Sequence, residues 1–178
     1  WFPNAQEVYL LSVNREMKEV LVHVTRDRAE APERLAVDLH LDGSERYRFR
    51  IDPMTPKPSL APPSTYLYDA DAALVAGRGI PALAKAFDLR QLHPESRLLT
   101  SDVLHSAFPG RVFQVNTIHP PFKGDWLDGA SVVVRGYPDK AEQIRQRMKL
   151  KENAEHYLLA TVWGENERGF IAARRIGA

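Results

Sequence analysis

The sequence predicts an α+β protein in which a small, mostly β unit is followed by a larger domain with a mixed sheet and helices. Three observations support this prediction. Residues 1–52 contain runs of β-branched and aromatic residues that are typical of strands. Five prolines then fall within eleven residues. Beyond them, helical patterns alternate with β-branched runs, as in chains that pack helices against a sheet.

Four strands are predicted in the first unit. Residues 7–13 and 19–24 are apolar runs separated by a short polar segment, and residues 35–41 alternate between apolar and polar positions. The turn signal Asp42-Gly43 comes before residues 47–51, in which aromatic and aliphatic side chains share one face. We therefore expect one small sheet over residues 1–52.

Residues 53–65 are predicted to form an extended connector. Proline has no amide hydrogen to donate to a helix or a sheet ladder, so the crowding of prolines at positions 53–63 disfavours both structures. The connector divides the chain into a first unit over 1–52 and a second domain over 66–178.

The second domain is predicted to contain three helices and four strands. The helices are an Ala-rich one over 69–76, with Asp69 or Asp71 near its start, a short one over 81–87 and a longer one over 138–150. The strands are expected over 111–118, 131–135, 156–163 and 168–174, and the last two form a hairpin.

The composition excludes several classes of protein. With 178 residues, of which 44% are hydrophobic and 26% charged, the chain has the make-up of a folded globular protein. No run approaches the roughly 20 apolar residues that a membrane helix needs. The absence of cysteine excludes disulfides, thiolate catalysis and cysteine-ligated metal sites. A formal net charge of +1 argues against a large basic field but permits a local patch.

A local basic patch is predicted over residues 131–151, which hold six basic and two acidic side chains. On a helix, Ala141, Ile144 and Met148 form a buried stripe, and basic side chains flank it at spacings of four. Such a cluster can neutralise phosphates and gain from counterion release. The alternative is a solvated helix face whose basic side chains cover apolar surface. The sequence leaves both interpretations open.

Other candidate sites have weaker support. The pattern GRGIPA at 77–82 matches a dinucleotide-binding loop, but a predicted helix precedes it and Pro81 removes an amide, which favours a corner between two helices. Asp69 and Asp71 are predicted to cap a helix and not to form an acid–base pair. The six histidines are dispersed, and Ser101 lacks a nucleophile-elbow motif. We assign no catalytic, cofactor-binding or metal-ligating residue.

Several segments, in order, resemble a bacterial protein family. YLYDADAALVAG at 66–77 is similar to the family's LYEPNAAIMKAG, LHPESRLLTS at 92–101 to LHPNSHLYTS, and FPGRVF at 108–113 to FPGRxF. VRGYP at 134–138, IRQRMKLK at 144–151 and YLLAT at 157–161 resemble VRNFP, LRKKLKLK and YLFAT. EVYLLSVNREMKE at 7–19 resembles VxVVSVNNECKELL. The family's segments come from the C-terminal regions of class I S-adenosylmethionine-dependent methyltransferases, where a ferredoxin-like unit precedes a THUMP-like domain.

The resemblance implies a ferredoxin-like unit over 1–52 and a THUMP-like domain over 66–178 of a cytoplasmic bacterial methyltransferase. Because THUMP domains dock structured RNA, a transfer or ribosomal RNA is the implied partner. The family's S-adenosylmethionine-binding loop has no counterpart here, which implies that this chain holds no cofactor and that S-adenosylmethionine binds to an upstream methyltransferase domain. That upstream domain is the second expected partner. No membrane is expected to be a partner. The residues expected to bind RNA phosphates are Arg135, Arg145, Arg147, Lys149 and Lys151, with Arg111, Arg174 and Arg175 as secondary candidates.

Two alternatives stay open. The chain could be a structural or oligomerisation module that packs on the methyltransferase domain and binds no RNA, which the near-neutral total charge favours. It could also be a self-contained enzyme that uses Asp69, Asp71 or His93, although nothing in the sequence brings these residues to one site.

Overall fold

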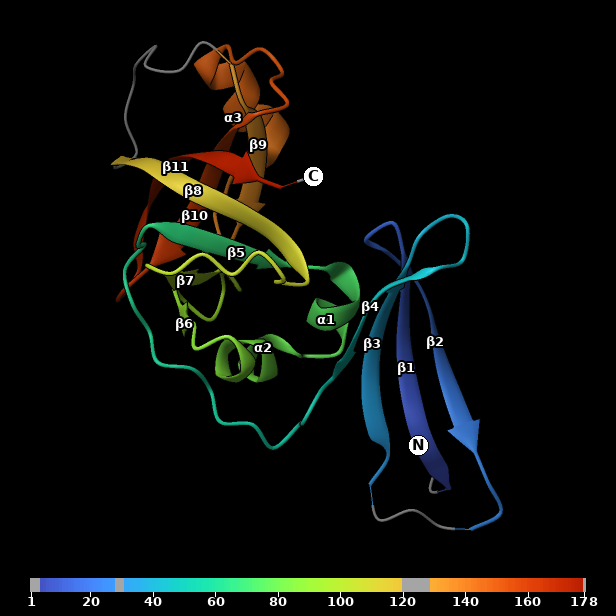
Figure 1. Ribbon diagram of the computed structural model, residues 1–178. Helices are drawn as coiled ribbons and strands as arrows, with labels where there is room; N and C mark the ends of the chain where they lie inside the picture. Colours follow the sequence, from blue (N-terminus) through green and yellow to red (C-terminus); the bar gives the residue numbers. More distant parts are fainter. Residues whose placement is uncertain (1–3, 28–30, 120–128, 178) are drawn as a thin grey trace. The chain divides into compact units, whose positions relative to one another are not determined.

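The computed structural model describes residues 4–27, 31–119 and 129–177 (Figure 1). They form two compact units, and neither unit is continuous in sequence. The first contains the residues up to 57 together with 70–86, and the second contains 58–69 together with the residues from 87 onward. The chain therefore passes between the units at 57/58, 69/70 and 86/87. No helix in the described ranges is long and apolar enough to cross a membrane.

The first unit is built on a four-stranded sheet with the order β2-β1-β3-β4 (Figure 1). Its strands are β1 (Ala5–Val13), β2 (Glu16–Val24), β3 (Glu33–Leu39) and β4 (Glu45–Arg50). β1 pairs antiparallel with β2 and parallel with β3. Asn14 and Arg15 join β1 to β2 with φ angles of 50° and 69°, the conformation that tight hairpins favour because it matches the strand twist.

Two short helices complete the first unit. α1 (Ala72–Ala76) packs on β1, β2 and β3, and α2 (Ile80–Ala86) follows it. Gly77 and Gly79 form the corner between the helices, and a Cβ atom on Gly77 would come within 2.5 Å of Ile51 Cδ1. The predicted corner between helices is confirmed. The dinucleotide-loop alternative is excluded because α1, and not a strand, precedes these glycines.

The second unit is built on a seven-stranded sheet with the order β6-β7-β5-β8-β11-β10-β9. Its strands are β5 (Tyr66–Ala70), β6 (Arg90–Gln91), β7 (Leu99–Ser101), β8 (Gly110–His119), β9 (Ser131–Arg135), β10 (His156–Trp163) and β11 (Glu167–Ile176). β10 pairs antiparallel with β11 and parallel with β9, so the sheet is mixed. α3 (Ala141–Met148) lies on the connection between the parallel strands β9 and β10, as parallel pairing requires a crossover.

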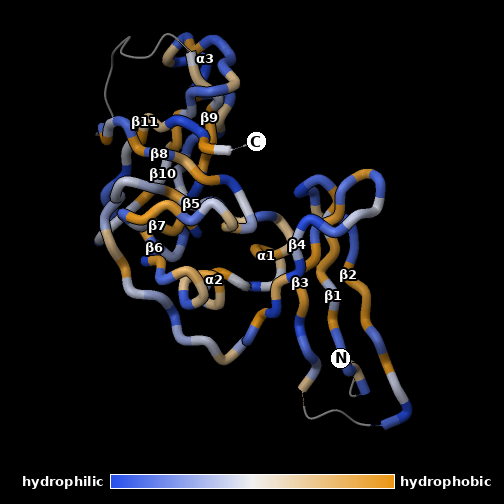
Figure 2. The backbone as a smooth tube through the Cα atoms, viewed as in Figure 1, coloured by the Kyte–Doolittle hydropathy of each residue, from blue (hydrophilic) through white to orange (hydrophobic). Residues whose placement is uncertain are grey.

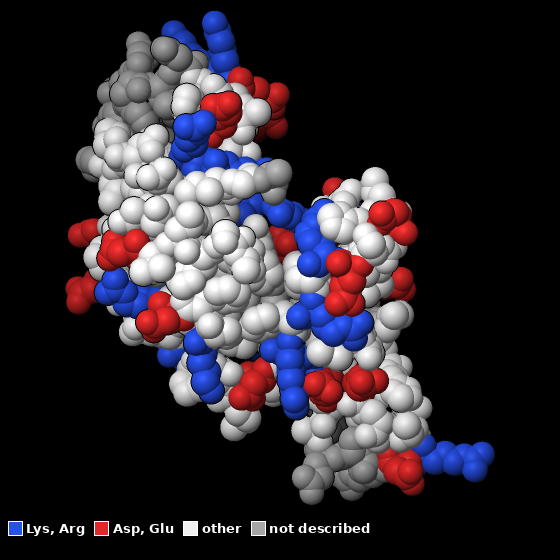
Figure 3. All heavy atoms as spheres, in the orientation of Figure 1, with Lys and Arg blue, Asp and Glu red and all other residues white. Residues whose placement is uncertain are grey.

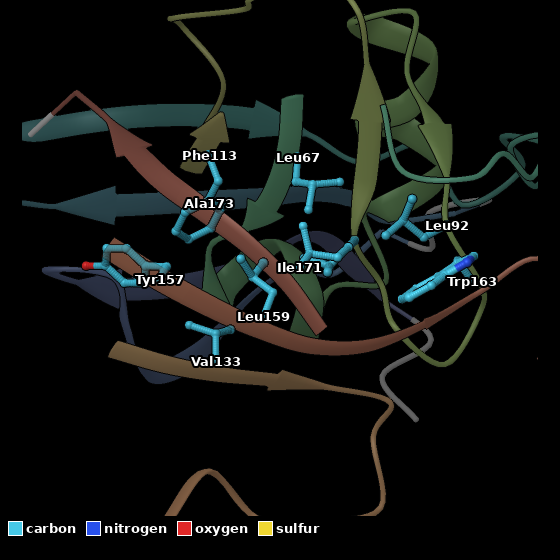
Figure 4. Packing of buried hydrophobic residues seen from close by; sticks show 10 residues of the cluster. Leu67, Leu92, Phe113, Val133, Tyr157, Leu159, Trp163, Ile171 and Ala173 are labelled. Atoms are coloured by element: carbon cyan, nitrogen blue, oxygen red, sulfur yellow. The ribbon is translucent and has the colours of Figure 1, made fainter. Parts of the chain in front are cut away.

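Apolar side chains cover both faces of the central strands in this sheet. Successive residues of a strand point to opposite faces. Leu159 and Ile171 therefore pack with Phe113 on one face (Figure 4), whereas Leu158 packs against Ile144 of α3 on the other. Burial on both faces explains why residues 157–163 form an almost continuous apolar run.

The α+β class is confirmed, and three local predictions differ from the structure. β5 lies where a helix start was expected, because the aromatic run at 66–68 extends a strand and α1 begins only at Ala72. The helix expected over 138–150 is confined to α3. β6 and β7 have no counterpart among the predictions, since strands of two or three residues show no periodicity.

The proline-rich segment is extended, but its second half is part of a unit. Ala61 N–H donates to Gln91 O at 2.9 Å, and Gln91 N–H donates to Ser59 O at 2.9 Å. Residues 58–65 therefore lie in the second unit.

Candidate nucleic-acid interface

The helix predicted to carry the basic patch is anchored by one fully buried side chain. Ile144 of α3 is 0% exposed and packs against Leu158 and Phe170 of the sheet. At the start of the helix, the backbone N–H of Lys140 donates to Gln143 Oε1 at 2.8 Å. The basic side chains of α3 are exposed or half-buried beside this anchor.

Arg145 and Arg147 are paired with surface carboxylates. Arg145 contacts Glu142 and Glu152, each at 3.1 Å, and Arg147 contacts Asp139 at 2.7 Å. Figure 3 shows basic and acidic side chains side by side at the α3 end of this unit. Glu142 and Glu152 are 70% and 81% exposed, and ion pairs so open to water contribute roughly 0–1 kcal/mol. Arg145 is therefore only weakly held, whereas the partner of Arg147, Asp139, is 33% exposed.

Lys149 and Lys151 follow the helix and do not continue it. Lys149 adopts a left-handed conformation with a φ of 53°, and its N–H donates to Gln146 O at 3.2 Å, which ends α3. The predicted spacing of four along one helix face, from Arg145 to Lys149 and from Arg147 to Lys151, is therefore wrong. Both lysines are exposed, and neither has an ion pair within the described residues.

Arg111 and Arg135 bind a buried carboxylate instead of facing solvent freely. Asp69 of β5 is 5% exposed and accepts hydrogen bonds from Arg111 Nη2 (2.5 Å) and Nε (3.2 Å), and from Arg135 Nε and Nη2 (both 2.9 Å). Three strands separate β5 from β9 in the sheet order. The contact with Arg135 therefore requires the sheet to curl until the end of β9 reaches β5.

The helix-cap predictions for the two aspartates have different outcomes. Asp69 lies in a strand and bridges β5, β8 and β9, so its predicted role as a cap is wrong. Asp71 occupies the N-cap position of α1, but its side chain makes no capping hydrogen bond. Arg15 lies 3.8 Å from the Asp71 carboxylate.

Arg174 and Arg175 do not form one patch, because neighbouring residues of β11 point to opposite faces of the sheet. Arg174 is exposed and lies 3.6 Å from the exposed Glu155. Arg175 is half-buried, and it has no ion pair among the residues that the structure describes.

A hollow of about 300 Å³ opens beside α3, and Ser131, Glu142, Arg145 and Glu152 contribute its polar lining. Its wall carries both signs of charge, so it is not a basic pocket. In the described part of the chain, no group of three or more His, Asp or Glu side chains could hold a metal ion.

Sequence reasoning missed one acidic residue that shapes this region and gave another, Asp69, the wrong role. Glu152 lies one position beyond the basic stretch and pairs with Arg145. Asp69 carried a usable signal: it stands in the apolar run YLYDA, and a charge buried in such a run needs a partner. Its partners could not be identified, because they lie 42 and 66 residues away in sequence.

Two family models match the chain. One describes a ferredoxin-like domain and matches residues 66–109, and the other describes a THUMP domain-like region and matches residues 110–175. The order of the two domains is the predicted order. The ferredoxin-like match lies downstream of residues 1–52, where the sequence analysis places that unit.

Among solved structures, the chain is similar to a "putative methyltransferase from Porphyromonas gingivalis W83". The two structures align with a TM-score of 0.86 and 27% sequence identity. The alignment covers 98% of this chain and 46% of the other, so this chain spans about half the length of that protein. A search of curated proteins gave no match.

Proposed function

This chain belongs to the family in which a ferredoxin-like domain is followed by a THUMP-like domain, and on that basis we propose that it docks structured RNA for a methyltransferase. THUMP-type domains bind RNA in general, and the chain is similar to about half of a methyltransferase. The RNA would be a transfer or ribosomal RNA. The role of the chain is to position this substrate, and no residue is assigned to methyl transfer.

The observation that carries the proposal is the set of basic side chains in and just after α3, which we call the basic strip: the half-buried Arg145 and the exposed Arg147, Lys149 and Lys151. Two of the four have no carboxylate partner within the described residues. Asp139, which contacts Arg147, is 33% exposed, and the two carboxylates that contact Arg145 are largely in water. Exchanging such a carboxylate for a phosphodiester costs little. Each phosphate contact then gains from the release of counterions.

The other four arginines that were predicted to bind RNA fall into two groups, which differ in whether a buried carboxylate holds them. Arg174 pairs with an exposed carboxylate, and Arg175 has no ion pair in the described ranges, so both stay as secondary contacts. Arg111 and Arg135 are held by the buried Asp69. Taking them away from Asp69 would leave a buried carboxylate without its partners, which is costly. We therefore assign these two arginines to the fold and not to the strip.

S-adenosylmethionine, the methyl donor of this class of enzyme, does not fit the glycine-rich segment at 77–79. The glycine-rich segment at 77–79 packs against Ile51 at a corner between two helices and offers no cradle for a nucleotide-like group. The methyl donor and the catalytic residues would belong to another part of a longer protein.

The proposal is tested by replacing Arg145, Arg147, Lys149 and Lys151 together with alanine. The control replaces Arg26, Lys57, Lys85 and Arg90, four exposed basic residues elsewhere, and so removes the same charge. Binding of a transfer RNA mixture and of a ribosomal RNA fragment is measured at several salt concentrations. We expect only the first variant to bind more weakly, with a salt slope smaller by about one per lost contact.

Equal RNA affinity for the wild type and the first variant would contradict the proposal. It would instead support the structural alternative, in which the chain packs on a methyltransferase domain. The extensive pairing of the arginines with carboxylates is the observation that favours that alternative.

A further inference from the structure

A second hollow, of about 440 Å³, opens at the end of β9 and lies entirely within the second unit. Its wall is formed by Glu95, Gly136, Tyr137, Pro138 and Arg168, and we call it the Tyr137 hollow. These residues come from three segments that are far apart in sequence. The volume is within the range of pockets that hold small organic groups.

The backbone at Gly136 brings the three segments together. Gly136 has a φ of 71°, and a Cβ atom there would lie 3.0 Å from the backbone carbonyl carbon of Glu95 and 2.9 Å from Val162 Cγ1. Val162 of β10 is paired with Arg168 of β11, so both side chains point to the same face of the sheet. The chain that leaves β9 therefore passes close both to Glu95 and to the strand position that carries Arg168.

The ring of Tyr137 forms the aromatic part of the wall. It is half-buried and packs against the buried Phe170, with the ring centroids 5.3 Å apart. Phe170 and Arg168 are two positions apart on β11 and therefore share one face of the sheet. The ring is thus supported by the core and still lines the hollow. Aromatic side chains placed in this way are the surfaces on which unpaired bases stack.

Arg168 and Glu95 place hydrogen-bond donors beside acceptors in the same wall. Arg168 Nη2 lies 3.7 Å from Glu95 Oε2, which is longer than a hydrogen bond. The two side chains are 42% and 59% exposed, and an ion pair so open to water contributes little to stability. Both groups can therefore turn to a ligand at little cost.

Among the four RNA bases, guanine matches this pair of groups. It presents two N–H donors side by side, at N1 and N2, which the two oxygens of a carboxylate can accept together. It also presents two acceptors side by side, O6 and N7, which a guanidinium contacts in the commonest specific arrangement. Because O6 is next to N1, the two contacts require a carboxylate and a guanidinium that are neighbours. Adenine, cytosine and uracil have no such pair of donors.

The Tyr137 hollow adjoins the basic strip. Tyr137 packs in the same hydrophobic cluster as Met148 of α3, and Met148 follows Arg147 of the strip. Most of α3 is hydrophilic (Figure 2). Burial and the charge of Asp139 raise the pKa of the Tyr137 phenol, whereas the charges of Arg147 and Arg168 act to lower it, so both guanidinium groups lie near the ring. A nucleotide whose base enters the hollow would direct its phosphates toward Arg147.

From these observations we infer that the Tyr137 hollow takes an unpaired guanine of the docked RNA. The base stacks on Tyr137, its N1–H and N2–H donate to Glu95, and its O6 and N7 accept from Arg168. The inference rests on the proposed function, in which the basic strip holds the RNA backbone, and it adds a contact that can read a base. The occupant is a base and not a phosphate, because the carboxylate of Glu95 would repel an anion.

RNA hairpins that differ in one base test the inference. They share one stem and a uridine-rich loop, and the central loop base is guanine, adenine, cytosine or uracil. Fluorescence anisotropy gives the dissociation constant of each hairpin for the 178-residue chain at one low salt concentration. We expect the guanine hairpin to bind at least about fivefold more tightly than the other three. Hypoxanthine at the same position, which lacks the N2 amino group, should lose much of this preference.

Glu95→Gln distinguishes a contact with the base from an effect of charge. If Glu95 acted only through its charge, its removal would strengthen the binding of all four hairpins alike. We expect instead that the variant loses the preference for guanine. Glu155→Gln is the matched control, because Glu155 forms a similar exposed pair with Arg174, at 3.6 Å, and does not line the hollow. This control should keep the preference for guanine.

Two substitutions at Tyr137 test the stacking contact. Tyr137→Phe keeps the ring and should bind the guanine hairpin as the wild type does. Tyr137→Leu keeps an apolar side chain against Phe170 and removes the ring, so it should weaken this binding by at least about fivefold. Circular dichroism checks that each variant is folded.

The inference is overturned if the four hairpins bind equally, if Glu95→Gln keeps the preference for guanine, or if Tyr137→Leu binds as the wild type does. It is also overturned if the guanine hairpin does not bind. The proposed docking of RNA is overturned only if the transfer RNA mixture and the ribosomal RNA fragment fail to bind as well.

Discussion

Replacing Asp69 with asparagine tests whether the buried carboxylate holds the curled sheet of the second unit. The substitution keeps the shape of the side chain and removes the charge that two guanidinium groups share. Asp69 is 5% exposed, whereas Arg111 and Arg135 are 29% and 36% exposed. The change therefore removes a buried charge from two partners that water reaches in part.

The expected loss follows from these exposures. Breaking a fully buried pair by removing one partner costs roughly 3–5 kcal/mol. Because both arginines recover some hydration, we expect Asp69→Asn to lower the free energy of unfolding by about 2–4 kcal/mol. For a chain of this size, that corresponds to a decrease in Tm of about 4–16 °C.

Urea denaturation followed by tryptophan fluorescence measures this loss. Replacing Trp1 and Trp126 with phenylalanine leaves Trp163, which is 8% exposed in the core of the second unit, as the reporter. Asp102→Asn is the matched control, because Asp102 lies in the same unit and accepts hydrogen bonds from Ser64 and Thr65 at the surface. A loss below about 1 kcal/mol for Asp69→Asn, no larger than that of an exposed pair, would refute the reasoning.

Three further predictions concern the second unit. Ile144→Ala removes the anchor of α3 and should destabilise the unit by about 2–5 kcal/mol in the same urea assay, whereas Gln146→Ala on the exposed side of the helix should have little effect. Gly136→Ala should cost about 1–3 kcal/mol, because Gly136 has a φ of 71° and its new Cβ would lie 3.0 Å from the backbone of Glu95; an unchanged Tm would contradict this. Burial raises the pKa of Tyr68 above its ordinary value of 10.0. A raised pKa means that the folded state holds the phenol proton more tightly than the unfolded state does. The contribution of Tyr68 to the free energy of unfolding should therefore be complete below pH 10 and should decrease as the pH rises through the folded pKa. A Tyr68→Phe variant should show a shallower decrease of the free energy of unfolding over the same pH range.

The sequence predicted the elements that have a strong periodic or compositional signal. β3 was predicted from the alternation of apolar and polar residues in its sequence, although residues 35–38 are all buried in the structure. β9, β10 and β11 carry β-branched or apolar runs, and these runs reflect their burial. β5 was missed because its five residues are followed almost directly by the Ala-rich segment of α1. The high helix propensity of that segment led to the prediction of a helix that begins within β5.

The candidate interface was predictable only in part. The anchor Ile144 and the exposed basic side chains around it follow from helical spacing. The left-handed Lys149 ends the helix early, and helix ends are set by cap geometry that the spacing does not contain. The pairing of Arg111 and Arg135 with Asp69 depends on strand order and sheet curvature, which are tertiary properties.

The chain crosses between its two units three times, and this limits how the protein can be cut into fragments that fold on their own. A cut at the proline-rich segment would give one piece without α1 and α2 and another in which residues 70–86 have lost the sheet beneath them. Two independently folding fragments are therefore unobtainable by a single truncation. The strands β1 to β4 are synthesised before residues 70–86, so the sheet of the first unit is covered by α1 only after those residues have been made.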